Sequence, residues 1–550
     1  MKNMKDYALG ISLFLASLFF LVIIVKSPVR NVMEARNFRA SEEILETGNW
    51  LFPTLNGAPR VVKPPLPTWA SALCAKIFGD SRNIFALRLP NLIVGILLVW
   101  FVFLLAKDIA GKQSAFFSTW IFVTSVPLIA EIGISRWDLF ATSFGLGSVW
   151  STCRMLQRGK VGYFFLSLVF FIASYLSKGP ILLALYIPFF LSMGILSWKF
   201  SEEKNADSSF AVFFPNGWKK WTAFVFLVIL GILGGHSWWF ASQIHYSGTW
   251  NTLYSDVTTL HSRHGEPFYY YLLQLPALMA PWTLILFLAL VLSVKEIYAS
   301  WSKKIKDHSL NKALFFGFLW FIIGLTMLSF FGAKKNRYFF PVSPSCCIFL
   351  GIFCEFLAMN GGIFQKEKLV QYTIFLQLWI HKIFLLLFPL AVFGLVWYQI
   401  PWYFILPAIP FGIAGFAFKT KQSIFQLVLF FSLTVMITTM LLFFAIEHSD
   451  FAQEEYEGAG AVKEITKGFP LYMFQKQNDS LLWAMGRNYI YFEKIEDLAT
   501  TKEIYILTEA TREKALQELL QSRKISIEKV YSFHENEKKK KLIWNLWKSK

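Results

Sequence analysis

Long runs of apolar residues recur along this 550-residue chain, and they constrain its fold more than any other feature. The first extends from Tyr7 to Val25, and a run of about 18 or more apolar residues is long enough to cross a bilayer as a helix. Only helices and closed barrels satisfy the backbone inside lipid, and these runs lack the alternation of barrel strands. The sequence therefore predicts an α-helical integral membrane protein. A hydrophobic fraction of 55% and a mean hydropathy of +0.47 agree with this prediction.

Hydropathy predicts about thirteen membrane spans. They are expected to begin near Tyr7, Ala86, Ser114, Leu139, Val161, Pro180, Trp221, Tyr269, Ala313, Phe339, Ile380, Trp402 and Ile424. Placing the N-terminus in the cytoplasm gives six cytoplasmic connections, and each of them carries lysine or arginine. This is the pattern of the positive-inside rule, which also accounts for most of the net charge of +18 without a nucleic-acid partner. An odd number of spans then leaves the C-terminus on the outer face.

The last hundred residues differ from the rest because they are polar and charged. Residues 503–508 and 525–533 have the pattern of strands, and residues 510–522 have the pattern of an amphipathic helix. We therefore predict a transmembrane domain at residues 1–446, with a large outer loop at 26–85, and a small soluble α/β domain at 447–550. Membrane lipids surround the first domain.

Two acids are placed on the predicted outer face. Glu34 follows the first span with Arg36 close by, and it is either a carboxylate acting on a hydroxyl or amine, or part of a solvated interfacial helix. Asp138 lies where an apolar run resumes, and an acid there is costly without a partner. It is either a functional carboxylate or the structural partner of Arg136.

Cations gather on the same face, against the positive-inside trend. Lys63 lies in the stiff segment K-P-P-L-P, where a fixed ammonium suits a phosphate, although it could also snorkel to a lipid headgroup. Lys335 and Arg337 lie in G-A-K-K-N-R-Y-F-F-P, for which phosphate or pyrophosphate is the natural ligand. Lys178, in S-K-G-P, is a weaker example of the same pattern.

One outer segment, H-S-R-H-G-E-P-F-Y-Y-Y, raises the question of a metal. His261, His264 and Glu266 have side chains that bind metals, but their spacing matches no standard zinc motif. Sugar or headgroup contacts are the favoured interpretation, and no cofactor is required. The chain also lacks a glycine-rich nucleotide loop, so a nucleotide-sugar donor is not expected.

The ordered set of outer motifs resembles the polytopic type-C glycosyltransferases that use polyprenyl-phosphate sugars, such as the bacterial aminoarabinose transferases and the protein O-mannosyltransferases. The resemblance covers the whole chain. It rests on E-A-R, G-N-W-L-F-P, K-P-P, R-x-D, K-G, H-x-x-P-F-x-Y-Y and K-x-R-Y-x-x-P, in that order. Two departures stand out: Met33 occupies the place of the family's usual aspartate in D-E-x-R, and Val62 that of the glutamate in E-K-P.

The resemblance implies a fold, a reaction and a location. It implies inverting transfer from an undecaprenyl-phosphate sugar to a lipid A-like, protein or other periplasmic acceptor, in a bacterial inner membrane. Glu34 or Asp138 would then be catalytic; Lys63, Lys335, Arg337 and Arg36 would bind the donor phosphate; Lys178, His264, Tyr270 and Tyr338 would bind substrate. The alternatives are a flippase or transporter of lipid-linked sugars, and a structural partner whose site Met33 has inactivated.

Overall fold

The computed structural model describes residues 2–29, 31–200, 218–263, 265–302, 309–359, 367–396, 423–447, 455–498, 503–537 and 540–549. The chain divides into two compact units. Unit 1 holds Met1–Lys26, Val61–Leu66 and Asn91–Ala445, and unit 2 holds Ser27–Arg60, Pro67–Pro90 and Ile446–Lys550. Most of the loop predicted at 26–85 thus groups with the C-terminal segment, which the sequence did not predict.

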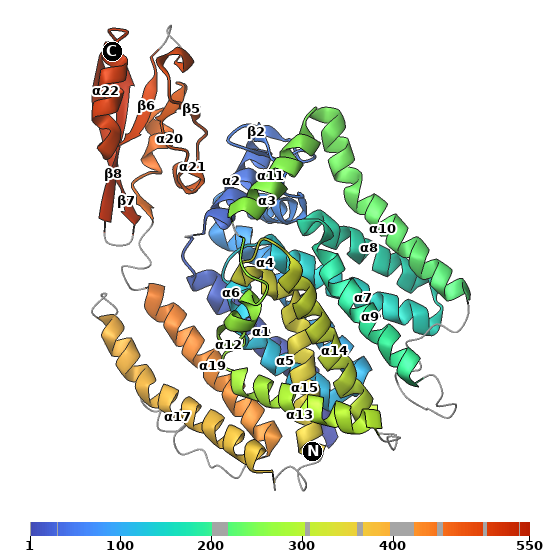
Figure 1. The fold of residues 1–550 in the computed structure, drawn as a ribbon. Helices are drawn as coiled ribbons and strands as arrows, with labels where there is room; N and C mark the ends of the chain where they lie inside the picture. The colour runs from blue at the N-terminus through green and yellow to red at the C-terminus, as the bar shows by residue number, and fades with distance from the viewer. Residues whose placement is uncertain are drawn as a thin grey trace. The chain divides into compact units, whose positions relative to one another are not determined.

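Unit 1 is helical (Figure 1). Its helices are α1 (Lys2–Lys26), α4 (Ile84–Ala110, whose first turns belong to unit 2), α5 (Lys112–Val123), α6 (Val126–Ile132), α7 (Trp137–Arg158), α8 (Val161–Lys178), α9 (Leu183–Phe200), α10 (Trp218–His245), α11 (Thr249–Arg263), α12 (Tyr270–Leu278), α13 (Thr283–Ser302), α14 (Ser309–Phe330), α15 (Ser343–Met359), α17 (Lys368–Val396) and α19 (Ile424–Glu447). The 3₁₀ segment η3 (Asn336–Val342) precedes α15.

Within the described residues, nine helices are long and apolar enough to cross a membrane, or ten if α5 and α6 form one bent span. The nine correspond to the spans predicted near Tyr7, Ala86, Val161, Pro180, Trp221, Ala313, Phe339, Ile380 and Ile424. The protein is a multi-pass membrane protein, as predicted. The span expected near Tyr269 is divided into α12 and α13, and the one near Trp402 lies outside the described residues.

The span expected near Ser114 is broken by its own sequence. Helices α5 and α6 meet at an angle of 58° across Thr124 and Ser125. The hydroxyl of Thr124 donates to the carbonyl of Trp120 at 2.7 Å, and Pro127, in the first turn of α6, has no N–H to continue a helix ladder. The turn brings the chain to α7 through a short connection.

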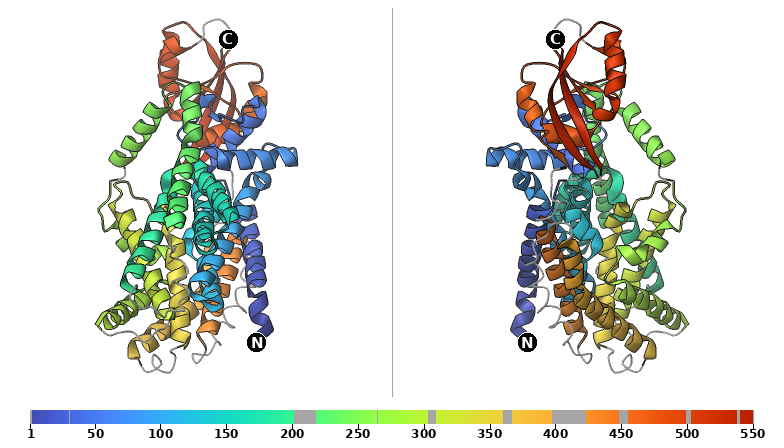
Figure 2. Two further views of the ribbon diagram at one scale, coloured as in Figure 1. Left: turned by 90° about the vertical axis from the view of Figure 1, so that its right-hand side faces the viewer. Right: turned by 90° about the vertical axis from the view of Figure 1, so that its left-hand side faces the viewer.

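Helix α7 was predicted as a span near Leu139. It is not among the nine helices that are apolar enough to cross a membrane, because its composition is too polar. It is almost wholly buried, and several of its hydroxyls find partners on neighbouring helices. Ser148 and Thr152 both bond to the hydroxyl of Tyr186 on α9, at 2.6 and 2.9 Å. Because these groups satisfy one another, a polar helix can lie among apolar ones. Helices α7 and α8 pack closely side by side (Figure 2).

Unit 2 is built on a six-stranded mixed sheet with the order β3-β7-β8-β6-β4-β5. The strands are β3 (Tyr456–Glu457), β4 (Leu471–Phe474), β5 (Ile490–Phe492), β6 (Tyr505–Glu509), β7 (Ile527–Glu537) and β8 (Lys540–Ser549), with α20 (Ala461–Ile465), α21 (Asp479–Met485) and α22 (Glu513–Gln521) between them. The predicted strands at 503–508 and 525–533 and the helix at 510–522 are confirmed as β6, β7 and α22. Strands β7 and β8 are the longest pair (Figure 2).

The loop part of unit 2 contains α2 (Val32–Thr47), α3 (Leu66–Phe78) and a hairpin of β1 (Thr54–Leu55) and β2 (Ala58–Pro59). Asn56 and Gly57 both have positive φ, as a two-residue hairpin turn requires. Glu43 fixes this turn by accepting from the backbone N–H groups of Asn56 and Gly57 at 2.7 and 3.2 Å.

Helix α2 is not the lipid-facing interfacial helix that the sequence offered as an alternative. Ten of its residues are buried within unit 2, and charged Arg39, Glu42 and Glu43 are among them. Phe38 packs edge-on against Trp483 of α21, with ring centroids 5.3 Å apart. The apolar side of α2 is therefore covered by the C-terminal segment.

Candidate functional site

The first turn of α7 places Asp138 against the last turn of α8. The carboxylate of Asp138 accepts a hydrogen bond from the ammonium of Lys178 in a close ion pair. Asp138 is nearly buried, whereas the Lys178 side chain is one-fifth exposed. Gly179 follows with φ of +74°, and the ring of Trp239 lies 3.1 Å from the position of a Cβ there, so the K-G element needs its glycine.

Arg136 does not pair with Asp138, which settles one alternative left open by the sequence. Its Nη1 instead donates to Oε1 of Glu131, at the end of α6, at 2.8 Å. Glu131 is 2% exposed. Two acids and two cations thus form two separate pairs at the start of α7.

Two cations lie over the ring of Tyr338 in η3, and a third, Lys335, interacts electrostatically with both of them. The ammonium of Lys178 is 5.1 Å from the ring centroid, and the guanidinium carbon of Arg337 is 5.3 Å from it. Burial and the neighbouring charges of Arg337 and Lys178 lower the pKa of Lys335. Placing like charges close together costs electrostatic free energy, and an anionic ligand would offset that cost.

Helix α12 supports this segment through its tyrosines. The buried Tyr271 donates from its hydroxyl to the carbonyl of Lys335 at 3.1 Å, and Tyr270 donates to the side chain of Asn336 at 2.7 Å. Lys334 donates to the carbonyl of Glu266 at 2.8 Å, which ties the same segment to the chain before α12. The cations of η3 are therefore held by backbone contacts as well as by their own side chains.

Lys63 also belongs to unit 1. Its ammonium lies 3.6 Å from the carboxylate of Asp256 on α11, and both side chains are about one-third exposed. The segment before the prolines is fixed by Trp239, whose indole N–H donates to the carbonyl of Val61 at 3.0 Å. A partly exposed lysine on a stiff segment can bind an anion as a point charge.

The other predicted acid, Glu34, lies in unit 2 in a very different setting. Its two carboxylate oxygens accept from Nε and Nη2 of Arg88 at 2.8 and 2.9 Å. Both side chains are essentially without exposed surface. As a base this carboxylate would first have to leave a bidentate buried pair, and its catalytic role stays a prediction.

Arg36, predicted as a phosphate ligand, is also in unit 2. Its Nε donates to the carboxylate of Asp479 in α21 at 2.7 Å, and its Nη1 lies 3.9 Å from the sulfur of Met33. About one-third of the Arg36 side chain is exposed. A phosphate would have to compete with Asp479 for this guanidinium.

The metal question involves residues that the structure does not describe in full. His264 lies outside the described residues, and the description of His261 is confined to its place in α11. Glu266 is exposed. No conclusion about a metal follows from these positions.

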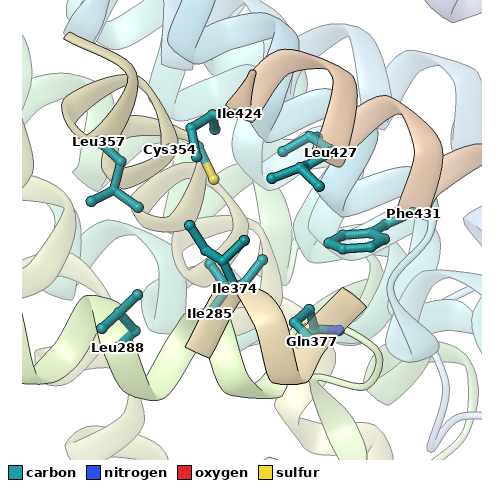
Figure 3. Close-up of a pocket in the computed structure, with 10 residues that line it drawn as sticks. Ile285, Leu288, Cys354, Leu357, Ile374, Gln377, Ile424, Leu427 and Phe431 are labelled. Carbon is teal, nitrogen blue, oxygen red and sulfur yellow. The ribbon is translucent and has the colours of Figure 1, made fainter. Parts of the chain in front are cut away.

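A separate apolar pocket lies between α13, α15, α17 and α19 (Figure 3). Its walls include Leu288, Cys354, Leu427 and Phe431, and Gln377 is its polar lining residue. None of the predicted site residues lines it.

Comparisons with known proteins agree with this architecture. Residues 62–213 match the dolichyl-phosphate-mannose-protein mannosyltransferase family. An uncharacterized protein of Aquifex aeolicus is 26% identical over 393 residues, which are 70% of this chain and 72% of that protein. The undecaprenyl phosphate-α-4-amino-4-deoxy-L-arabinose arabinosyl transferase of Edwardsiella ictaluri is 27% identical over 49% of this chain, and the match spans only 48% of that relative.

At the level of the fold, the similarity to known structures covers nearly the full chain. The structure of ArnT from Cupriavidus metallidurans in the apo state matches with a TM-score of 0.69 and 14% identity, covering 98% of both chains. A second structure of that ArnT, bound to undecaprenyl phosphate, matches with a TM-score of 0.68. The chain therefore has an ArnT-like fold, and parts of its sequence are similar to a mannosyltransferase family and to arabinosyl transferases.

Sequence reasoning missed several residues of this candidate site. Glu131 interrupts an apolar run and so needed a partner, which was a usable signal. Its partner Arg136 is five positions away, outside the usual helical spacings of three and four. Tyr271, Asp256 and Arg88 carried no such signal, because long-range contacts alone give them their roles.

Proposed function

We propose that this glycosyltransferase moves a sugar from an undecaprenyl-phosphate carrier to a lipid A-like or other periplasmic acceptor, with inversion at the anomeric carbon. The observation that supports it most is the grouping of Lys178, Lys335 and Arg337 around Tyr338, beside Asp138. An anionic lipid headgroup fits such a site.

The charge of the leaving group explains why cations would accelerate the reaction. The phosphodiester of the donor carries one negative charge. When the acceptor oxygen bonds to the anomeric carbon and the bond from that carbon to the phosphate oxygen breaks, the departing polyprenyl phosphate gains a second charge. Fixed cations stabilise that charge more in the transition state than in the bound donor.

Asp138 would act on the acceptor. A hydroxyl acceptor must lose a proton, and a positioned base contributes roughly 10²–10⁴-fold. If the acceptor is an ionised phosphate, no proton is lost and the carboxylate orients it. Lys63 and Arg36 would assist with the phosphate, and Tyr270, Tyr338 and His264 with the sugar. Glu34 remains the alternative base.

Purified protein in nanodiscs, supplied with a labelled undecaprenyl-phosphate sugar and lipid A, tests the proposal. Lys335→Ala together with Arg337→Ala should raise the donor KM and lower kcat, leaving the acceptor KM nearly unchanged. Lys295→Ala is a matched control, because that lysine forms an exposed pair with Glu367 at 2.6 Å. Lipid flipping without transfer by the wild type would point to the flippase instead.

The proposed orientation has about thirteen spans, a cytoplasmic N-terminus and a periplasmic C-terminal domain in the bacterial inner membrane. Six basic connections support it. Single cysteines at Ser480 and Ser302, in a cysteine-free background, test it with an impermeant reagent on spheroplasts. We expect labelling at position 480 and none at 302; the reverse would place the acids beside cytoplasmic nucleotide sugars.

The proposal includes no required metal. The support is the spacing of His261, His264 and Glu266, together with Val62 at the place of the family's glutamate. Activity should survive EDTA. Loss with EDTA and recovery with zinc or magnesium would contradict it.

A further inference from the structure

Glu131 and Arg136 form a charge pair to which the proposed reaction gives no role. Glu131 lies in the last turn of α6 and is almost fully buried, and Arg136 is the N-cap residue of α7, two positions before Asp138. A buried carboxylate in a membrane protein costs free energy unless a partner compensates its charge. The question is what the pair does for the site beside it.

The geometry of the pair is incomplete. Among the described residues, Oε2 of Glu131 and Nε of Arg136 are both buried without a hydrogen-bond partner. Only Nη1 and Oε1 meet, at 2.8 Å, although an arginine and a carboxylate can form two parallel bonds. Arg136 is thus held by a single hydrogen bond to Glu131, and Asp138 follows it by two positions at the start of α7.

Asp138 is the competing partner. The Glu131 carboxylate interacts electrostatically with Asp138, Arg136 and Lys178 together, so the four charges form one group. Two arrangements of that group can be compared, and only the first pairs both acids. In one, Arg136 takes Glu131 and Lys178 takes Asp138; in the other, Arg136 turns to Asp138 and releases Lys178.

We propose that Glu131 is a positioning residue, which holds Arg136 away from Asp138 so that Lys178 remains the partner of that carboxylate. The inference rests on the proposed function, because it assigns Asp138 and Lys178 to the reacting site. Lys178 in this arrangement also stays over the ring of Tyr338. The sequence analysis offered the opposite pairing, of Arg136 with Asp138, as one of two alternatives.

The test compares Glu131→Gln, Arg136→Met and the double variant. Glu131→Gln frees Arg136 to displace Lys178, and transfer per folded molecule should fall roughly tenfold or more, as coupled neighbouring charges do. Removing the competitor as well should restore most of the rate in the double variant. Glu355→Gln is the control, since that glutamate of α15 bonds to Ser114 away from this group.

A second readout does not require transfer. In Glu131→Gln, Lys178 is released from Asp138 and should react faster with an amine-directed reagent. In the double variant it should react at the wild-type rate. Peptide mass spectrometry measures both rates. Unchanged Lys178 reactivity in Glu131→Gln overturns the inference, as does a double variant no better than the single one. A wild type without transfer in any donor assay would instead refute the proposed function, and the Lys178 result would still decide the pairing.

Discussion

Two acid–base pairs on the predicted outer face show how differently the same sequence signal can be used. Glu34 in unit 2 makes two parallel bonds to Arg88 in a site closed to solvent. Asp138 in unit 1 makes a single described pair with a one-fifth-exposed lysine, close to two further cations. The first arrangement satisfies both charges fully. In the second arrangement the cations outnumber the acid, and this excess of positive charge favours the binding of an anion.

The variant Asp138→Asn should have the largest effect, and it tests whether the Asp138 carboxylate takes part in the reaction. If Asp138 is the base for a hydroxyl acceptor, kcat should fall by roughly 10²–10⁴-fold, because the amide cannot accept the proton. The folded fraction should stay close to that of the wild type.

Asp108→Asn provides the matched control for that variant. Asp108 pairs with Arg154, near the other end of α7, so the same chemical change removes an ion pair remote from Asp138 along that helix. Near-normal turnover in Asp138→Asn would remove this residue from the reaction.

The variant Glu34→Gln tests whether the buried pair in unit 2 is structural or catalytic. Breaking a buried ion pair leaves Arg88 without its full counter-charge, and the free energy of unfolding should fall by about 3–5 kcal/mol. Thermal unfolding in detergent and the transfer rate per folded molecule separate the two roles. A lower rate with unchanged stability would show that Glu34 is the base suggested by its place in the sequence.

The pH dependence of donor binding tests the cation group of unit 1. The pKa of Lys335 is lowered by burial and by the charges of Arg337 and Lys178, so its ammonium is lost at a lower pH than that of an ordinary lysine. Donor affinity should therefore fall as pH rises through that lowered pKa.

Lys335→Arg should move this loss of affinity to higher pH, because a guanidinium stays charged. The measurement is the donor Kd across a pH series for both proteins. Identical curves would mean that Lys335 does not contact the phosphate.

The smallest effect is expected at Arg36 and Asp479. Both side chains are partly exposed, and such pairs contribute about 0–1 kcal/mol. Asp479→Asn should hardly change the stability of unit 2. If Arg36 binds the donor phosphate, however, the same variant should lower the donor KM by removing a competing anion, and an unchanged KM would leave Arg36 a purely structural contact.

The amino-acid sequence by itself determined the features that depend on local composition. Nine of the thirteen spans predicted from apolar runs match described helices that could cross a membrane, because the length needed to cross a bilayer is fixed. Alternating and amphipathic patterns predicted β6, α22 and β7. The cationic segment of η3 was identified because positive charge there opposes the topology rule. The break between α5 and α6 was missed, because a run of the right hydropathy conceals a bend at Thr124 and Ser125.

Only the tertiary structure decided how the charges are paired and what covers them. Glu34 and Asp138 look alike as acids at the ends of apolar runs. The Glu34 carboxylate is nevertheless paired with a fully buried Arg88, whereas Asp138 is paired with the partly exposed Lys178. The polar helix α2 is buried because α21, more than four hundred residues away, packs on it. Electrostatic free energy depends on distance and solvent exposure, and both are set by contacts between segments far apart in the chain.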